Sequence, residues 1–210
     1  MKPSFDELKL VIGAMVILAL ATSLMVVVPW LLLERASPVG TDLKPYTEPQ
    51  LRGRQQYIAN GCVYCHSQQP RDPAQAPDMA RGWGRPSVAM DYYYDNPHLL
   101  GTMRTGPDLL NIAARQPSRD WHLGHLYQPR AYLPGSIMPA YPFLFEERPL
   151  GALAKSDVVV RLPPGFAPPN VAVVARGEAL DLVAYLLSLD RTYPVVPRPK
   201  PPAAAKAAPP

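Results

Sequence analysis

Two cysteines three positions apart, followed at once by a histidine, constrain this chain more than any other feature. The motif is Cys62-Val63-Tyr64-Cys65-His66, and its cysteines are the only two among 210 residues. This is the C-x-x-C-H pattern of covalent c-type haem attachment. Each thiol adds to one vinyl group of the porphyrin, and the histidine is held against the ring face as an axial ligand of the iron. We therefore predict one covalent haem c, bound through Cys62, Cys65 and His66.

Two other interpretations of this motif stay open, a structural zinc knuckle and a redox-active dithiol. A closed zinc site needs four ligands, so two more would have to come from His or Asp elsewhere in the chain. A thioredoxin-type dithiol follows a strand of an α/β pattern, and no such pattern is visible here. Both alternatives need partners or a context that the haem interpretation does not need, so the haem is favoured.

The second constraint is an apolar run from Leu10 to Leu33, which has 24 residues and no charged side chain. A helix of this length extends about 36 Å, enough to cross a hydrocarbon core of about 30 Å. A cleavable signal peptide is the alternative, because Ala19-Leu20-Ala21 has the small-x-small form of a cleavage site. However, the chain stays strongly apolar beyond that point, and Trp30 suits the membrane interface. We predict an uncleaved transmembrane anchor over residues 1–35.

The orientation of this anchor follows from the haem rather than from the flanking charges. Lys2 and Lys9 are balanced by Asp6 and Glu7, so the positive-inside signal is weak. Covalent haem attachment takes place on the outer face of an energy-transducing membrane. For a bacterium, this predicts a single-pass protein of the inner (cytoplasmic) membrane with its haem domain on the periplasmic side. The formal net charge of +4 is too small to indicate a nucleic-acid partner.

Proline shapes the expected architecture. The chain has 28 prolines, and average usage is about 5%. Long irregular connections are therefore expected, rather than a helix bundle or a sheet-rich fold. We predict a mainly α protein, in which a single N-terminal transmembrane helix precedes a class I cytochrome c-like haem domain with long irregular loops. The expected parts after the anchor are a linker over 36–47, the haem domain over 48–190 and a Pro/Ala-rich disordered tail over 191–210.

Three helices are expected in the haem domain. Thr47-Glu48-Pro49-Gln50 has the capping-box form and predicts a helix to about Gly61, with Leu51 and Ile58 on its apolar face. The stretch Ser118 to Tyr127 is a second helical segment. A third is expected from Arg176 to Leu189, where the apolar face consists of Ala179, Leu182, Val183 and Leu186. A helix that runs into the haem motif and a closing helix of this form are what a small haem domain packs together.

The iron needs a second axial ligand. The candidates outside the membrane are Met79, Met90, Met103, Met138, His98, His122 and His125. Met138 lies between two prolines in Pro134-Gly135-Ser136-Ile137-Met138-Pro139, a rigid loop that holds a thioether without a supporting helix. His122 and His125 are three residues apart in one predicted helix, so at most one of them is a plausible ligand. We expect Met138 to be the ligand, although a lone methionine is more often core filler.

A turn at Gly106-Pro107-Asp108-Leu109 is expected beside the axial histidine. A ligating histidine usually donates its second ring N–H to a carbonyl, which fixes the orientation of the ring. We expect the carbonyl of Pro107 to be that acceptor, and Leu109 to pack on the porphyrin. Arg104 lies just before the turn and is expected to pair with a haem propionate.

Four stretches together resemble one known family. They are Gly61 through Gln68, Arg104 through Leu109, Trp121-His122 with Pro129-Arg130, and Gly135 through Pro142. Over roughly residues 5–190, the chain is similar to the mono-haem cytochrome c subunit (subunit II, FixO/CcoO type) of cbb3-type cytochrome c oxidase. The resemblance implies a class I cytochrome c fold with Cys62 and Cys65 as thioether anchors, His66 and Met138 as axial ligands, and Pro107 as the carbonyl partner.

The resemblance also implies a function in aerobic respiration. In this family the subunit passes electrons to the haem b of a membrane-embedded catalytic subunit, which reduces oxygen. The expected donor is a further cytochrome c subunit or a soluble cytochrome. The chain itself is expected to carry out no catalysis, because a six-coordinate iron leaves no open position for a substrate. Two alternatives stay open: the cytochrome c subunit of a nitric oxide reductase, and a free-standing membrane-tethered electron shuttle.

Two stretches depart from the pattern of that family. After Ser-Gln the family usually continues with a Met-Ile-Arg-Pro type run, where this chain has Gln69-Pro70-Arg71-Asp72-Pro73. A Trp-Gly that usually precedes the Arg-Thr-Gly-Pro run is replaced by Leu99-Leu100-Gly101. Both departures lie in the connection that is expected to contact the partner, so they concern the identity of the partner more than the haem site.

Overall fold

The computed structural model describes residues 5–36, 43–72, 74 and 79–194. The chain divides into two compact units. The N-terminal helix belongs to the first unit, and residues 43–193 belong to the second. Half of the predicted linker (residues 37–42) and most of the predicted tail (residues 195–210) lie outside the described residues.

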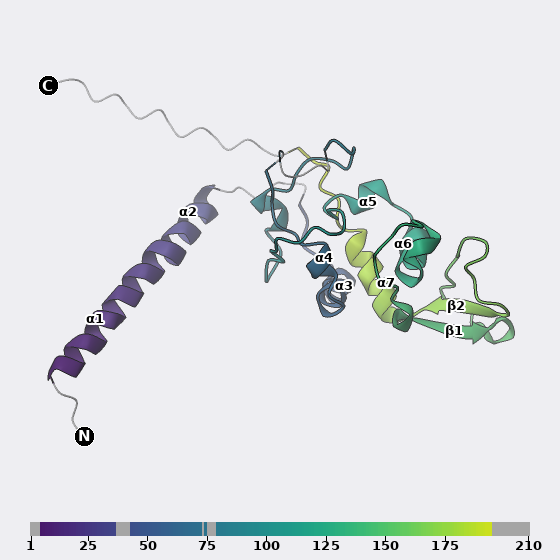
Figure 1. The fold of residues 1–210 in the computed structure, drawn as a ribbon, viewed down its shortest axis with the longest axis horizontal. Coiled ribbons are helices and arrows are strands. Elements are labelled where there is room, and N and C mark those ends of the chain that lie inside the picture. Colours follow the sequence, from purple (N-terminus) through teal and green to yellow (C-terminus); the bar gives the residue numbers. More distant parts are fainter. Residues whose placement is uncertain (1–4, 37–42, 73, 75–78, 195–210) are drawn as a thin grey trace. The chain divides into compact units, whose positions relative to one another are not determined.

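The N-terminal segment is one long helix, as the apolar run predicts. It consists of α1 (Phe5–Thr22), a π-helical turn (Ser23–Val27) and α2 (Val28–Ala36) (Figure 1). Its portion Asp6–Leu32 is long and apolar enough to cross a membrane, and none of that portion is buried against the protein. In a regular α-helix, the ring of Pro29 would clash with the carbonyl four residues earlier, and that carbonyl lies inside the π turn here. The wider turn accommodates this clash without breaking the helix.

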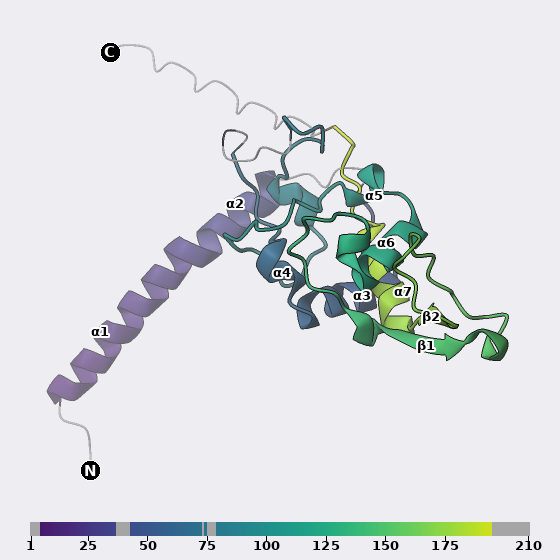
Figure 2. The same cartoon turned by 45° about the vertical axis from the view of Figure 1, so that its right-hand side comes forward.

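The core of the second unit is the packing of α3 (Glu48–Ala59) against α7 (Gly177–Leu186), which Figures 1 and 2 both show side by side. The two backbones approach so closely that a Cβ at Gly53 would lie 1.8 Å from the carbonyl oxygen of Asp181. Tyr57 packs edge-on against Tyr185, with ring centroids 5.5 Å apart. The apolar face predicted for α7 is buried: Ala179, Leu182, Val183 and Leu186.

The predicted apolar face of α3 is wrong. Leu51 is 47% exposed and Ile58 is 37% exposed, whereas the buried residues of this helix are Gly53, Arg54 and Tyr57. The close crossing with α7 decides this, because a residue without a side chain must face the other backbone. The N-terminus of the helix does follow the prediction, since the backbone N–H of Thr47 donates to Oε1 of Gln50 at 2.8 Å.

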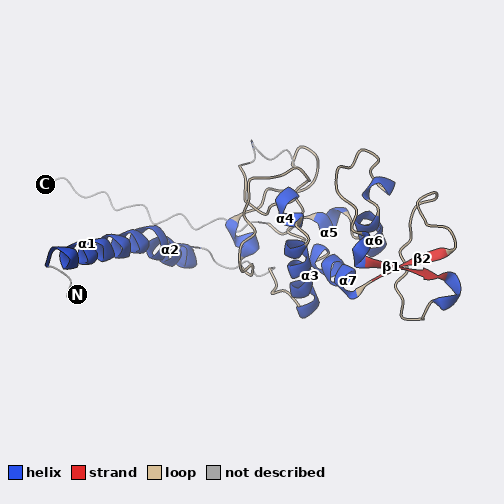
Figure 3. Ribbon diagram, turned by 60° about the horizontal axis from the view of Figure 1, so that its bottom comes forward, coloured by secondary structure: helices blue, strands red, loops and turns tan. Residues whose placement is uncertain are grey.

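Shorter elements complete the second unit. They are α4 (Cys62–Cys65), α5 (Ile112–Arg115), α6 (Arg119–Tyr127) and 3₁₀ turns at Ala89–Tyr92, Pro129–Ala131, Pro142–Leu144 and Leu150–Ala152. The helix α6 matches the predicted segment, and the hydroxyl of Ser118 caps it by accepting from the N–H of Trp121 at 3.2 Å. Irregular connections join these elements, as the proline content predicts (Figure 3).

A two-stranded antiparallel hairpin has no counterpart among the predicted elements. Strand β1 (Phe145–Pro149) pairs with β2 (Val171–Ala175) in a register that places Phe145 opposite Ala175 (Figure 3). The valine-rich sequence of β2 is the signal that predicts a strand here. Because Val173 and Val174 are buried, the hairpin extends the core beyond the helices.

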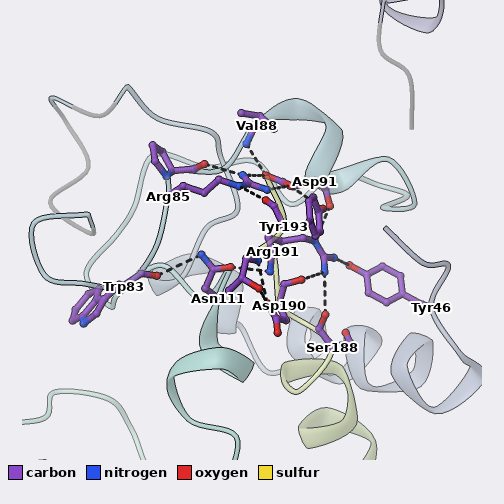
Figure 4. A network of polar contacts seen from close by, with 12 residues as sticks. Tyr46, Trp83, Arg85, Val88, Asp91, Asn111, Ser188, Asp190, Arg191 and Tyr193 are labelled. Carbon is purple, nitrogen blue, oxygen red and sulfur yellow. Dashed lines mark hydrogen bonds and ion pairs between the residues drawn. The ribbon is translucent and has the colours of Figure 1, made fainter. Parts of the chain in front are cut away.

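Polar contacts fix the long connection between the haem motif and the Gly-Pro turn. The carboxylate of Asp91, 1% exposed, accepts from Arg85 at 2.7 and 2.8 Å and from the hydroxyl of Tyr193 at 2.9 Å (Figure 4). Arg191 donates to the carbonyl oxygens of Asp91 and Ser188. This network ties residues 85–91 to the C-terminal end of the unit, so the connection is held in place although it has little regular structure.

Candidate haem site

The two cysteines of the motif lie one helical turn apart. The helix α4 begins after Gly61, whose φ of +72° is a left-handed conformation that favours glycine. Cys62 and Cys65 are therefore at positions i and i+3, which share a face of the helix. Both thiols are free; Cys62 is buried and Cys65 is exposed. Burial raises the pKa of the Cys62 thiol to about 11.

The ring of His66 is fixed by the Gly-Pro turn. Its Nδ1 lies 2.7 Å from the carbonyl oxygen of Pro107, the contact expected for an oriented axial histidine. With Nδ1–H donating there, Nε2 keeps its lone pair for a metal. Burial, more than any neighbouring charge, lowers the pKa of His66, which favours the neutral imidazole that binds metals.

Two residues that the sequence did not single out complete the support of His66. A Cβ at Gly106 would lie 2.1 Å from Cε1 of the His66 ring, so only glycine allows the turn to approach this closely. The N–H of Gly106 donates to the carbonyl oxygen of Cys65 at 3.0 Å. The hydroxyl of Tyr57 donates to the carbonyl oxygen of His66. These contacts link the motif both to the turn and to α3.

Arg104 precedes the same turn, and its guanidinium group contacts one side chain and two backbone carbonyls of the protein. Its Nη1 pairs with the carboxylate of Asp108 at 2.6 Å. Its Nε donates to the carbonyl oxygen of Ser67 at 2.6 Å, and its Nη2 donates to that of Gln69 at 2.8 Å. The side chain thus fastens the segment after the haem motif to the Gly-Pro turn. Its pairing with a haem propionate stays a prediction.

The candidate second ligand lies in a loop that is attached to α6. The N–H of Tyr141 donates to the carbonyl oxygen of Leu126 at 2.9 Å, and the N–H of Met138 donates to the hydroxyl of Ser136 at 3.2 Å. Met138 and Leu109 are both half-buried and pack against the core cluster. Their roles toward the haem stay predictions.

The other ligand candidates differ in their surroundings. Met79 and Met103 are more than half exposed. His122 is buried, and its Nε2 lies 2.8 Å from the carbonyl oxygen of Gln116. His125 stacks on Trp121 with ring centroids 4.6 Å apart.

The residues of this site fit a covalently bound haem. Two free thiols stand one turn apart, the axial histidine has one nitrogen oriented and the other left for a metal, and glycine keeps the turn close to the ring. On α6, the buried Nδ1 of His125 has no hydrogen-bond partner among the described residues. Among the described residues, no group of three or more His, Cys, Asp or Glu side chains is placed to hold a metal ion, so the zinc interpretation finds no ligand set there.

The comparison with protein families gives one finding. A family model described as cytochrome C oxidase, mono-heme subunit/FixO, matches residues 5–161, about three quarters of the chain. The match covers the apolar helix, the haem motif, the Gly-Pro turn and Met138. Residues 162–210, which include β2 and α7, lie beyond it. No curated protein matches the chain.

Proposed function

Because the chain belongs to the FixO family, the mono-haem subunits of cbb3-type cytochrome c oxidase, we propose that it is an anchored electron carrier. It passes electrons to the haem b of the membrane-embedded catalytic subunit, which reduces oxygen. A further cytochrome c subunit or a soluble cytochrome supplies the electrons. The observation that carries the proposal is the hydrogen bond between Nδ1 of His66 and the carbonyl oxygen of Pro107, beside two free thiols.

Each residue of the site has a stated role in this proposal. Cys62 and Cys65 would hold the haem through two thioether bonds, and His66 and Met138 would be the ligands of its iron. The bound haem supplies a one-electron Fe(III)/Fe(II) couple. Pro107 holds the His66 ring in one orientation, which keeps the ligand geometry similar in both oxidation states. With His66 and Met138 both taken up as ligands, the bound haem would transfer electrons and would bind no substrate at the iron.

The N-terminal helix contributes proximity. It anchors the haem domain to the bacterial inner membrane, on the periplasmic side where covalent haem attachment takes place. Tethering raises the effective concentration of the haem domain at the catalytic subunit without adding a contact. The anchor therefore matters for the rate of electron delivery and not for haem binding.

Purification and complementation test this function. The full chain is expected to co-purify with a membrane subunit that reduces oxygen, and to restore oxygen reduction in a complex that lacks it. A shorter chain that begins near Ala36 is expected to carry haem and undergo normal redox cycling, yet to restore oxygen reduction poorly at equimolar concentration. The matched control is the full chain at the same haem concentration.

Three results would contradict the proposal. One is co-purification with a subunit that reduces nitric oxide and not oxygen. Another is full restoration by the shorter chain at equimolar concentration. The third is rapid turnover of oxygen by the isolated chain, because a filled sixth position leaves no site for the gas.

A further inference from the structure

His125 has a buried ring nitrogen that no group of the described residues satisfies. The ring stacks on Trp121 with an interplanar angle of 9° and meets Tyr132 edge-on at 6.0 Å between centroids. Its Nδ1 is buried and has no hydrogen-bond partner. Leaving a buried polar group unpaired costs free energy, and native proteins rarely do so. The partner of this nitrogen is therefore expected to be a bound cofactor, or a side chain that moves when the cofactor binds.

The second histidine of the same helix shows the contrast. His122 lies one turn earlier on α6 and is 3% exposed. Its Nε2 has a partner, the carbonyl oxygen of Gln116 at 2.8 Å. Burial of an imidazole on α6 thus does not by itself leave a nitrogen unpaired, and His125 differs from its neighbour in this respect.

Both ends of the loop that carries Met138 lie against α6 near His125. At the start of the loop, the Tyr132 ring packs on His125, and a Cβ at Gly124 would lie 1.8 Å from the Tyr132 hydroxyl oxygen. At its end, the N–H of Tyr141 donates to the carbonyl oxygen of Leu126 at 2.9 Å. The residues before and after His125 in α6 therefore hold the two ends of this loop.

The protonation state of His125 suits a hydrogen-bond donor. Burial, followed by the charges of His122 and His66, lowers the pKa of this ring to about 4. The ring is consequently neutral at pH 7, with a single N–H to donate. An uncharged donor beside the two ends of the Met138 loop suits a site where charge would disturb the iron.

We propose that His125 is a positioning residue for the second axial ligand, and that in the haem-bound protein its Nδ1–H donates a hydrogen bond to the sulfur of Met138. The inference rests on the proposed function, because it needs the haem in place. A thioether sulfur is a weak acceptor, so the bond requires a donor that is already oriented. Trp121 and Tyr132 orient this ring before the bond forms, so little side-chain freedom is lost.

The expected effect of this bond is on the reduction potential. Donation to the sulfur withdraws electron density, which weakens the bond from sulfur to Fe(III) more than the bond to Fe(II). The ferrous state is thereby favoured and the potential is raised, in the way that hydrogen bonds around a metal site tune its properties. Removing the donor should lower the potential while both thioether attachments stay intact.

Three variants of the full-length haem protein test this. His125→Leu removes the donor, and His125→Asn places an amide N–H near the position of Nδ1. His122→Gln is the matched control, because it keeps a donor for Gln116 on the same helix. The measurements are the midpoint potential and the weak sulfur-to-iron absorption band of the ferric protein, at equal covalent haem content. We expect a lower potential and a shifted or weakened band in His125→Leu, recovery of both toward wild type in His125→Asn, and no change in His122→Gln.

Several results would overturn the inference. An unchanged potential and band in His125→Leu would do so. A lower potential with an unchanged band would place the partner of His125 elsewhere, for example at a haem propionate. Absence of the sulfur-to-iron band from the wild-type ferric protein, together with loss of the six-coordinate haem spectrum in His125→Leu, would make His125 itself the ligand. If His125→Leu does not accumulate, His125→Gln replaces it. The glutamine amide lies near the position of Nε2 and not of Nδ1, so this variant should also show the lower potential. Failure of the proposed function looks different, since the wild-type chain would then lack covalent haem or would not restore oxygen reduction, whatever the potentials of the His125 variants.

Discussion

Replacing Gly106 by alanine should destabilise the site at its most crowded point. The added Cβ would lie 2.1 Å from Cε1 of His66 and 2.6 Å from each ring nitrogen. The ring would have to move by about 1.3 Å to restore an ordinary contact of 3.4 Å. Such a movement breaks the 2.7 Å hydrogen bond from Nδ1 to the carbonyl oxygen of Pro107.

The cost of this substitution has two parts. Forcing an extra methyl group into a packed site costs about 1–3 kcal/mol. Losing the hydrogen bond of a buried ring adds about 0.5–1.5 kcal/mol. We therefore expect Gly106→Ala to lower the free energy of unfolding by about 2–4 kcal/mol. The midpoint potential should change as well, because the ring is a ligand whose orientation the turn sets.

Guanidinium unfolding of the full chain, followed by haem absorption, measures this cost. Two other glycines form a graded control. A Cβ at Gly101 would lie 3.1 Å from Cβ of Ser67, so Gly101→Ala should cost less than Gly106→Ala. A Cβ at Gly151 would meet nothing within 4 Å, and Gly151→Ala should change stability by no more than about 0.5 kcal/mol. Equal stability and equal potential of Gly106→Ala and Gly151→Ala would refute the reasoning.

Three further substitutions are expected to separate ligation, support and attachment. Met138→Ala should abolish the sulfur-to-iron absorption band of the ferric protein and leave the haem attached; persistence of the band would reject Met138 as ligand. Arg104→Met should lower the free energy of unfolding by about 3–5 kcal/mol in guanidinium titration, because it removes the ion-pair partner of the largely buried Asp108 carboxylate, which then keeps the N–H of Leu110 as a donor; a loss below about 1 kcal/mol, the range of surface pairs, would contradict that role. Cys62→Ser should leave a single thioether or no haem protein, as judged by the pyridine haemochrome spectrum, and an unaltered spectrum would show that this thiol is not an anchor.

Sequence reasoning succeeded where a local rule fixes the outcome. Membrane length and apolar composition predict the N-terminal helix, and the capping-box form of Thr47 to Gln50 predicts the start of α3. The contact between His66 and Pro107 follows from what an axial histidine requires of its second nitrogen, so one motif predicted the position of another some 41 residues later.

Sequence reasoning failed where a distant contact partner determines which face of a helix is buried. The apolar residues Leu51 and Ile58 look like the core face of α3, but the close crossing at Gly53 turns that face outward. No spacing rule reveals that a glycine in one helix meets the backbone of another helix more than a hundred residues later.

The support of the haem site shows the same limit. The position of Arg104 just before the Gly-Pro turn suggested a contact with the haem. Its partners Ser67, Gln69 and Asp108 depend instead on how two loops meet. The glycine at position 106 reads as part of a turn, and only the structure relates it to the ring of His66.

The most direct test of the account is the intact mass of the wild-type chain purified from membranes under denaturing conditions. The account predicts the mass of the polypeptide plus one haem, in a species that keeps its colour through acidified-acetone extraction. A chain with the mass of the polypeptide alone, whose haem is extracted into the solvent, would contradict the central claim that Cys62 and Cys65 hold one haem covalently.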